Sequence, residues 1–239
     1  MASRKQAFIG GMKAGIPIAL GYFAVSFTFG MMAVQAGLTV WQSTLISLTN
    51  LTSAGQFASL SIITAGGSLL ELALNQFVIN LRYMLMSFSV SQKLDRRYPF
   101  FHKFFVAFGI TDEIYGASAS RPGKNSPWYH YGAMALAIPG WTIGTLVGAA
   151  AGEILPAIVM SALSVAIYGM FLAIIIPPAK KNHFLWIVIL SAMALGAIFQ
   201  YVPGLNKISA GFVIIIITVL VSALAAVIRP IREEDGHAD

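Results

Sequence analysis

Long apolar stretches separated by short polar connections dominate the pattern of this chain. Eight such stretches can be delimited, at 15–37, 43–66, 69–90, 104–120, 130–151, 154–176, 184–202 and 208–228. A helix needs about 20 predominantly apolar residues to cross the hydrocarbon core of a bilayer, and most of these stretches approach that length. The pattern predicts an all-α polytopic membrane protein. We expect one transmembrane domain over 1–239, with a short cytoplasmic N-terminus (1–12) and a polar C-terminal tail (229–239).

Two of the eight stretches depart from the pattern of an ordinary span. Between residues 43 and 64, 11 of 22 residues are Ser, Thr, Asn or Gln, and 104–120 is short, interrupted by glycine and contains two adjacent acids. Broken or re-entrant helices are tolerated at membrane depth where they line a cavity walled by protein. The sequence therefore predicts about six full transmembrane helices plus two broken or re-entrant segments, 43–66 and 104–120.

The distribution of positive charge favours this topology. If all eight stretches cross from a cytoplasmic N-terminus, nine Lys and Arg residues lie inside and five outside. If 43–66 and 104–120 instead return to the side they entered from, thirteen lie inside and one outside. Short cytoplasmic loops carry an excess of Lys and Arg, so the second arrangement is preferred.

Composition narrows the class of function. The chain is 57% hydrophobic and 10% charged, whereas soluble domains carry about 25% charged residues. The net charge of +6 lies mainly in short loops, where it orients spans, so no nucleic-acid partner is expected. Without cysteine, a histidine cluster or a nucleotide-binding glycine loop, we expect no metal, no cofactor and no enzyme activity.

Three charges lie deep inside apolar stretches: Arg82, Asp112 and Glu113. Charge in hydrocarbon is costly, so it normally faces a partner, a cavity or a transported species. Arg82 either extends to the headgroups or pairs with one of the two acids. Thr111 or Asp112 can also cap a half-helix starting at about residue 113. Adjacent helical positions point about 100° apart, so we expect one carboxylate to be structural and the other to titrate.

Uncharged polar residues of the same region are candidates for substrate binding. They can bind the ammonium and carboxylate of a zwitterion or simply hydrogen-bond neighbouring helices, and both interpretations stay open. The candidates are Asn50, Thr52, Ser53, Gln56, Asn75, Asn80 and Thr111.

Four glycines recur at intervals of four in the stretch 130–151 and just beyond it, at Gly140, Gly144, Gly148 and Gly152. They form a smooth packing seam. The seam seats either another helix of the same chain or a second subunit.

Several motifs, in this order, resemble the AzlC-type branched-chain amino-acid exporters. They are GIPIALGY (15–22), FG (29–30), AGL (36–38), AGQF (54–57), NLRY (80–83) and TDE (111–113). Ser53 departs from the Gly and Ala that the family tends to place ahead of the glutamine. The resemblance implies the large subunit of a bacterial cytoplasmic-membrane permease. Such permeases usually work with a small hydrophobic subunit of the AzlD type and export by the proton-motive force.

Residues and resemblance together predict a secondary transporter that exports branched-chain or similar apolar amino acids. Asp112 or Glu113 would couple protons, with Arg82 as the counter-charge, and the uncharged candidates would orient the substrate. The alternative is a passive channel for a small neutral solute, built on the two re-entrant segments.

Overall fold

The computed structural model describes residues 3–154 and 182–229, together with the single positions 158, 172, 175, 176, 179 and 180. Helices make up most of this described part, which contains no β-strand, only an isolated bridge between Leu94 and Asn125. The predicted all-α class is therefore confirmed. The predicted span 154–176 and the tail 229–239 lie, except for a few single positions, outside the described residues.

The chain divides into two compact units. The first comprises residues 1–60 and 80–170, and the second comprises 61–79 and 171–239. Helices α3 (Ala54–Thr64) and α4 (Leu69–Lys93) contribute residues to both units. Whether the two units work as the single predicted domain stays a prediction.

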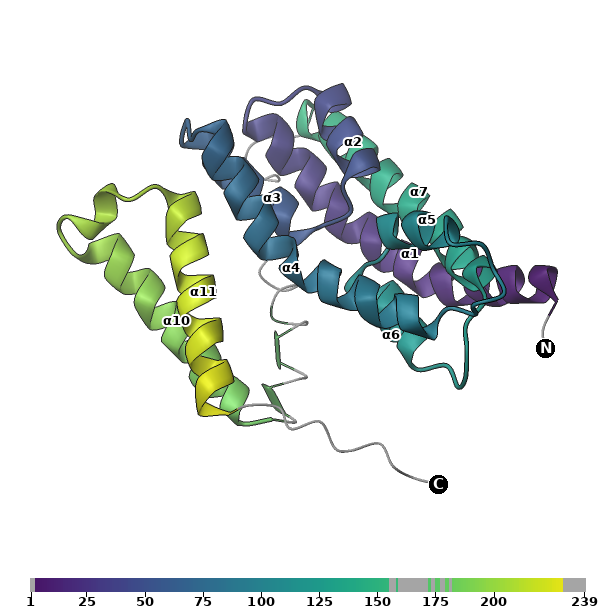
Figure 1. Cartoon of the computed structure of the whole chain (residues 1–239). Helices are drawn as coiled ribbons and strands as arrows, with labels where there is room; N and C mark the ends of the chain where they lie inside the picture. The colour runs from purple at the N-terminus through teal and green to yellow at the C-terminus, as the bar shows by residue number, and fades with distance from the viewer. Residues whose placement is uncertain are drawn as a thin grey trace. The chain divides into compact units, whose positions relative to one another are not determined.

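Helices α1 (Arg4–Gln35) and α7 (Pro127–Gly152) lie side by side in the first unit (Figure 1). A reciprocal capping box between Ser3 and Gln6 starts α1 eleven residues before the apolar stretch predicted at 15–37. Helix α7 begins at Pro127, after the side-chain cap Ser126.

The glycine seam of α7 faces α1 of the same chain. A Cβ on Gly140 would lie 2.8 Å from the carbonyl oxygen of Ala19, and one on Gly148 would lie 2.7 Å from Cα of Phe27. The contact is reciprocal, because a Cβ on Gly15 of α1 would lie 2.9 Å from the carbonyl oxygen of Ala133. The two backbones therefore approach so closely that no side chain fits between them at these positions.

Both segments predicted to be broken are interrupted helices. In the first, α2 (Val40–Thr49) and α3 are separated at 50–53, where Ser53 adopts a positive φ of 46°. In the second, α5 (His102–Phe108) and α6 (Asp112–Ala119) are separated at 109–111. Thr111 is extended and caps α6, which begins one residue before the predicted start.

Four described helices are long and apolar enough to cross a membrane: α1, α7, α10 (Phe184–Tyr201) and α11 (Ala210–Ile228). The bounds of α7, α10 and α11 match the predicted spans 130–151, 184–202 and 208–228 within three residues. Helix α4, with 25 residues, has the length of the predicted span 69–90 but is not among the four. The predicted number of full spans stays a prediction.

In the second unit, α10, the short 3₁₀ helix η1 (Leu205–Lys207) and α11 follow one another along the chain. The start of α11 is held by the first turns of α4. The carboxylate of Glu71 accepts hydrogen bonds from the hydroxyl of Ser209 (2.5 Å) and the amide of Gly211 (3.0 Å). Asn75 Nδ2 donates to the carbonyl of Gly211 at 3.3 Å. Two buried polar residues of α4 thus satisfy backbone groups at the N-terminus of α11.

Candidate functional site

The two helix interruptions of the first unit meet the same short stretch of α4. At the first interruption, the hydroxyl of Thr52 lies 2.5 Å from Oδ1 of Asn80. At the second, Nη1 of Arg82 lies 2.9 Å from Oδ2 of Asp112. Because Asn80 and Arg82 are two residues apart on one helix, both interruptions are tied to a single turn of α4. This convergence defines the candidate site.

Arg82 is the cation of the site. Its side chain and that of Asp112 are 40% and 44% exposed, so the ion pair faces open space in this unit rather than the packed core. The guanidinium also donates to the hydroxyl of Tyr83 at 3.1 Å and lies 4.8 Å from the centroid of that ring. Of the two interpretations of Arg82 left open by the sequence, the structure contains the pairing with an acid.

Glu113, the second acid, has a different partner. The hydroxyl of Tyr22 on α1 donates a hydrogen bond to Oε2 of Glu113. Thr111 acts as a cap, because its hydroxyl accepts from the amide of Ile114 at 3.4 Å. One acid therefore faces a cation while its neighbour faces a neutral donor, as expected for adjacent helical positions that point apart.

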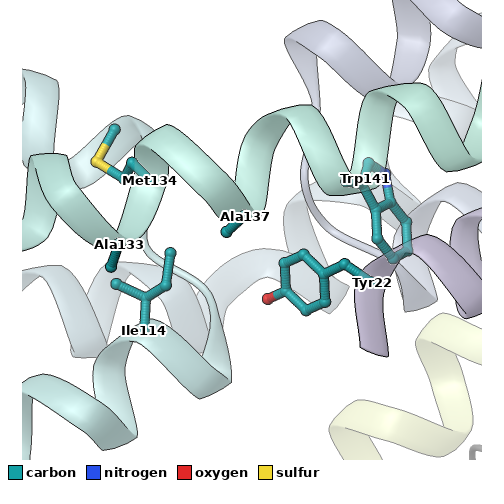
Figure 2. Close-up of a cluster of buried hydrophobic side chains, with 6 residues drawn as sticks. All are labelled: Tyr22, Ile114, Ala133, Met134, Ala137 and Trp141. Carbon is teal, nitrogen blue, oxygen red and sulfur yellow. The ribbon is translucent and has the colours of Figure 1, made fainter. Parts of the chain in front are cut away.

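A hydrophobic cluster packs around Tyr22, the residue that donates to Glu113. It contains Tyr22, Ile114, Ala133, Met134, Ala137 and Trp141, shown in Figure 2. The rings of Tyr22 and Trp141 meet edge to face, with centroids 5.3 Å apart. Leu51 of the first interruption packs against the same cluster, so both interruptions share one core with α1 and α7.

A buried hydrogen-bond chain joins the first interrupted segment to α7. Trp141 Nε1 donates to Oε1 of Gln56 at 2.9 Å, and Gln56 Nε2 donates to the hydroxyl of Ser47 at 2.9 Å. The hydroxyls of Ser47 and Thr145 lie 2.7 Å apart. Buried polar atoms are costly unless they are paired in this way. In this conformation both polar atoms of the Gln56 side-chain amide form hydrogen bonds to other side chains, as expected if Gln56 joins neighbouring helices. A role of Gln56 in substrate binding stays a prediction.

The remaining candidates separate into two groups. Asn50 and Ser53 are half-buried residues of the first interruption, where Asn50 ends α2 in an extended conformation. Asn75 belongs to the second unit, where it holds α11. All the other candidates, Asn50, Thr52, Ser53, Gln56, Asn80 and Thr111, lie in the first unit with the three charges, whereas Asn75 lies in the second unit with Glu71.

Sequence reasoning missed four residues of this site: Tyr22, Ser47, Trp141 and Thr145. The hydrogen bonds Tyr22–Glu113, Trp141–Gln56 and Ser47–Thr145 join residues that lie 85 to 98 positions apart along the chain. Two signals in the sequence bear on them: Tyr22 ends the GIPIALGY motif, and Ser47 is one of the polar residues counted between 43 and 64.

The candidate site combines groups of opposite charge. Within the described part of the chain, no three His, Asp or Glu residues cluster in a way that could hold a metal. The site instead offers one cation, one paired acid and one acid held by a phenol, above an aromatic core.

Comparison with known proteins agrees with the membrane pattern. The profile of the AzlC family, described as "AzlC protein", matches residues 17–155. An "Uncharacterized membrane protein" of Archaeoglobus fulgidus is 30% identical over 88% of this chain and 91% of that protein. "Inner membrane protein YgaZ" of Escherichia coli is 27% identical over 90% of this chain and 91% of that protein.

An "Uncharacterized membrane protein" of Helicobacter pylori is 26% identical over 58% of this chain and 61% of that protein. No solved structure matches the chain significantly. The family profile covers more than half of the chain and includes α7 and both interrupted segments. This chain is a membrane protein that belongs to the AzlC family.

Proposed function

We propose that this protein is a secondary transporter that exports branched-chain or similar apolar amino acids across the bacterial cytoplasmic membrane. The observation that carries the proposal is the convergence of two helix interruptions on Asn80 and Arg82 of α4. Transporters bind substrates where discontinuous helices meet, because the freed helix ends and unwound backbone supply polar groups inside a protein-walled cavity.

The ion pair fits the charges of an amino acid. The ammonium of the substrate binds Asp112 and its carboxylate binds Arg82, so the substrate replaces the direct contact between the two side chains. Thr52 and Asn80 lie beside this exchange and orient the substrate. The apolar side chain packs toward the aromatic core that contains Tyr22 and Trp141.

Glu113 is the proton-coupling group in this proposal. Among the described residues it forms no salt bridge, and Tyr22 donates to it. Asp112 in contrast is neutralised by Arg82. A proton moving onto Glu113 changes the charge beside the substrate and leaves the ion pair intact. Export then uses the proton-motive force, and a small hydrophobic subunit of the AzlD type completes the transporter.

The decisive experiment is uptake and release of labelled leucine in proteoliposomes, with and without a pH gradient and the small subunit. We expect transport that responds to the gradient. Asp112→Asn and Arg82→Ala lose substrate binding, whereas Glu113→Gln retains exchange of labelled for unlabelled leucine but loses the response to the gradient. Glu153→Gln, at an exposed carboxylate after α7, is the matched control and behaves as the wild type.

The outcome against the proposal is equally specific. If all three site variants fold and export leucine normally, the charges do not carry transport. A solute flux that ignores an imposed pH gradient in the wild type would favour the passive channel instead.

A further inference from the structure

A cluster of cations outside the candidate site lies on α5 and on the two loops that flank α5 and α6. The loops are held together by backbone hydrogen bonds, from Asp95 N to Asn125 O (2.9 Å) and from Asn125 N to Lys93 O (2.8 Å). They enclose an open cavity of about 480 Å³ lined by Ser91, Gln92, Arg96, Lys103 and Lys124. Three of these five residues are cationic and none is acidic.

The acid nearest along the chain, Asp95, interacts mainly with Arg97, which does not line the cavity, and only weakly with Lys124. Asp95 is bound by Arg97, whose Nε lies 3.1 Å and 3.0 Å from its two carboxylate oxygens. These hydrogen bonds lower the pKa of Asp95 to about 2, so its charge is compensated by Arg97. Lys124 donates to the backbone carbonyl of Gln92 at 2.9 Å. The cavity therefore keeps an excess of positive charge and suits an anion.

An exposed aromatic face adjoins the cavity. Phe101, Phe104, Phe105 and Phe108 are spaced i, i+3, i+4 and i+7, which places them on one side of α5, and each is between 52% and 67% exposed. The other side of α5 buries Val106 against a core of Val90, Leu94 and Ile110. The phenylalanines are thus turned away from the core of the first unit, and their large apolar surface suits a hydrocarbon environment.

One side chain links the two features. Nζ of Lys103, which lines the cavity, lies 5.3 Å from the ring centroid of Phe100. The ring of Phe100 in turn meets that of Phe104 edge to face, with centroids 5.4 Å apart. A ligand with a negative head and an apolar tail can therefore occupy the cavity and the aromatic face together.

We propose that this cavity binds the phosphate-bearing headgroup of an anionic phospholipid, whose acyl chains lie along the aromatic face of α5. Basic pockets between membrane helices bind anionic headgroups, and the purely apolar phenylalanine rings suit acyl chains. Free phosphate shares the chemistry of the headgroup but gains nothing from the four phenylalanines. A water-soluble acidic partner would leave them exposed.

The test titrates the purified protein in detergent with short-chain phosphatidylglycerol and with phosphatidylcholine of the same acyl chains, followed by native mass spectrometry. We expect at least tenfold tighter binding of phosphatidylglycerol. This preference should shrink as salt is raised, because salt screens exposed charges. Equal binding of the two lipids at low salt overturns the proposal without any variant.

Variants then locate the site. Each removed cation should weaken phosphatidylglycerol binding about fivefold, so Arg96→Gln/Lys103→Gln/Lys124→Gln should lose roughly a hundredfold. The matched control is Lys5→Gln/Lys13→Gln/Lys207→Gln, which changes the net charge equally at exposed positions that do not line the cavity. If the two triple variants lose the same affinity for phosphatidylglycerol, the binding depends on the net charge of the protein and not on this cavity, and the proposal is refuted.

Two further arms separate the remaining occupants. Phe104→Ser/Phe108→Ser should weaken phosphatidylglycerol binding while leaving the weak binding of inorganic phosphate unchanged. If inorganic phosphate binds as tightly as the lipid, the cavity is a site for free anions and the assignment to a phospholipid is wrong. If a small AzlD-type subunit displaces the lipid, the aromatic face belongs to that subunit and the proposal also fails.

Discussion

Replacing Gly148 by alanine tests the close approach of α1 and α7. A Cβ at this position would lie 2.7 Å from Cα of Phe27 and closer still to the carbonyl oxygen of that residue. Ordinary van der Waals contact with a Cβ begins at 3.4 Å, so the two backbones would have to separate by about 0.7 Å or more. The obstacle is backbone, which has no side-chain rotamer through which to yield.

The magnitude follows from a matched comparison. Alanine is favoured over glycine inside a helix by about 1 kcal/mol, and this gain applies equally to Gly21→Ala on α1, where a Cβ would meet nothing within 4 Å. The difference between the two variants therefore isolates the clash. Overpacking costs about 1–3 kcal/mol. A clash of about 2 kcal/mol corresponds to a Tm difference of roughly 4–8 °C for a domain of this size.

The assay is thermal unfolding of the purified protein in detergent, extended to a third variant. A Cβ on Gly152 would lie 3.2 Å from Cα of Met31, a much milder contact. We expect Tm to fall in the order Gly21→Ala, Gly152→Ala, Gly148→Ala. The reasoning is refuted if Gly148→Ala is as stable as Gly21→Ala, or if Gly152→Ala is the least stable of the three.

Three further changes probe the hydrogen bonds described above. Tyr22→Phe removes the donor to Glu113 but keeps the ring against Trp141; it should leave Tm within about 4 °C and weaken leucine transport driven by a pH gradient in proteoliposomes. Gln56→Leu leaves the indole N–H of Trp141 without its acceptor. A buried unsatisfied group costs about 1–3 kcal/mol, so Tm should fall by several degrees. An unchanged Tm would contradict a structural role of Gln56. Glu71→Leu removes the acceptor of the Gly211 amide and should speed hydrogen exchange at the start of α11, whereas unchanged protection there would show that the cap is dispensable.

The sequence revealed interruptions and seams because they depend on local composition. Serine, threonine and glycine in an apolar stretch weaken a continuous helix, so both broken segments could be predicted from 43–66 and 104–120 alone. The spacing of Gly140 and Gly148 likewise indicated a packing face. It did not indicate which helix the face would meet, because that choice depends on the path of the chain.

Long-range pairing was beyond the sequence for the same reason. Arg82 was recognisable as the counter-charge because few charges lie in apolar stretches, and the structure places it on Asp112. Tyr22 and Trp141 are unremarkable in a membrane helix, and nothing in their spacing indicated Glu113 or Gln56 as partners. Asn75 was grouped with the binding residues because it is polar, but its amide holds the backbone at Gly211.

Because of the glycine seam, the site consists of two kinds of element: the rigid pair of α1 and α7, and the two interrupted segments. Tyr22 and Trp141 stand on α1 and α7, whose backbones are in direct contact and therefore cannot slide past each other cheaply. Gln56 and Glu113 stand on the interrupted segments. Their hydrogen bonds to Trp141 and Tyr22 therefore connect the interrupted segments to the rigid pair of α1 and α7. Any movement of the interrupted segments against this helix pair would have to break such hydrogen bonds, the Ser47–Thr145 bond included, while α1 and α7 stay in contact.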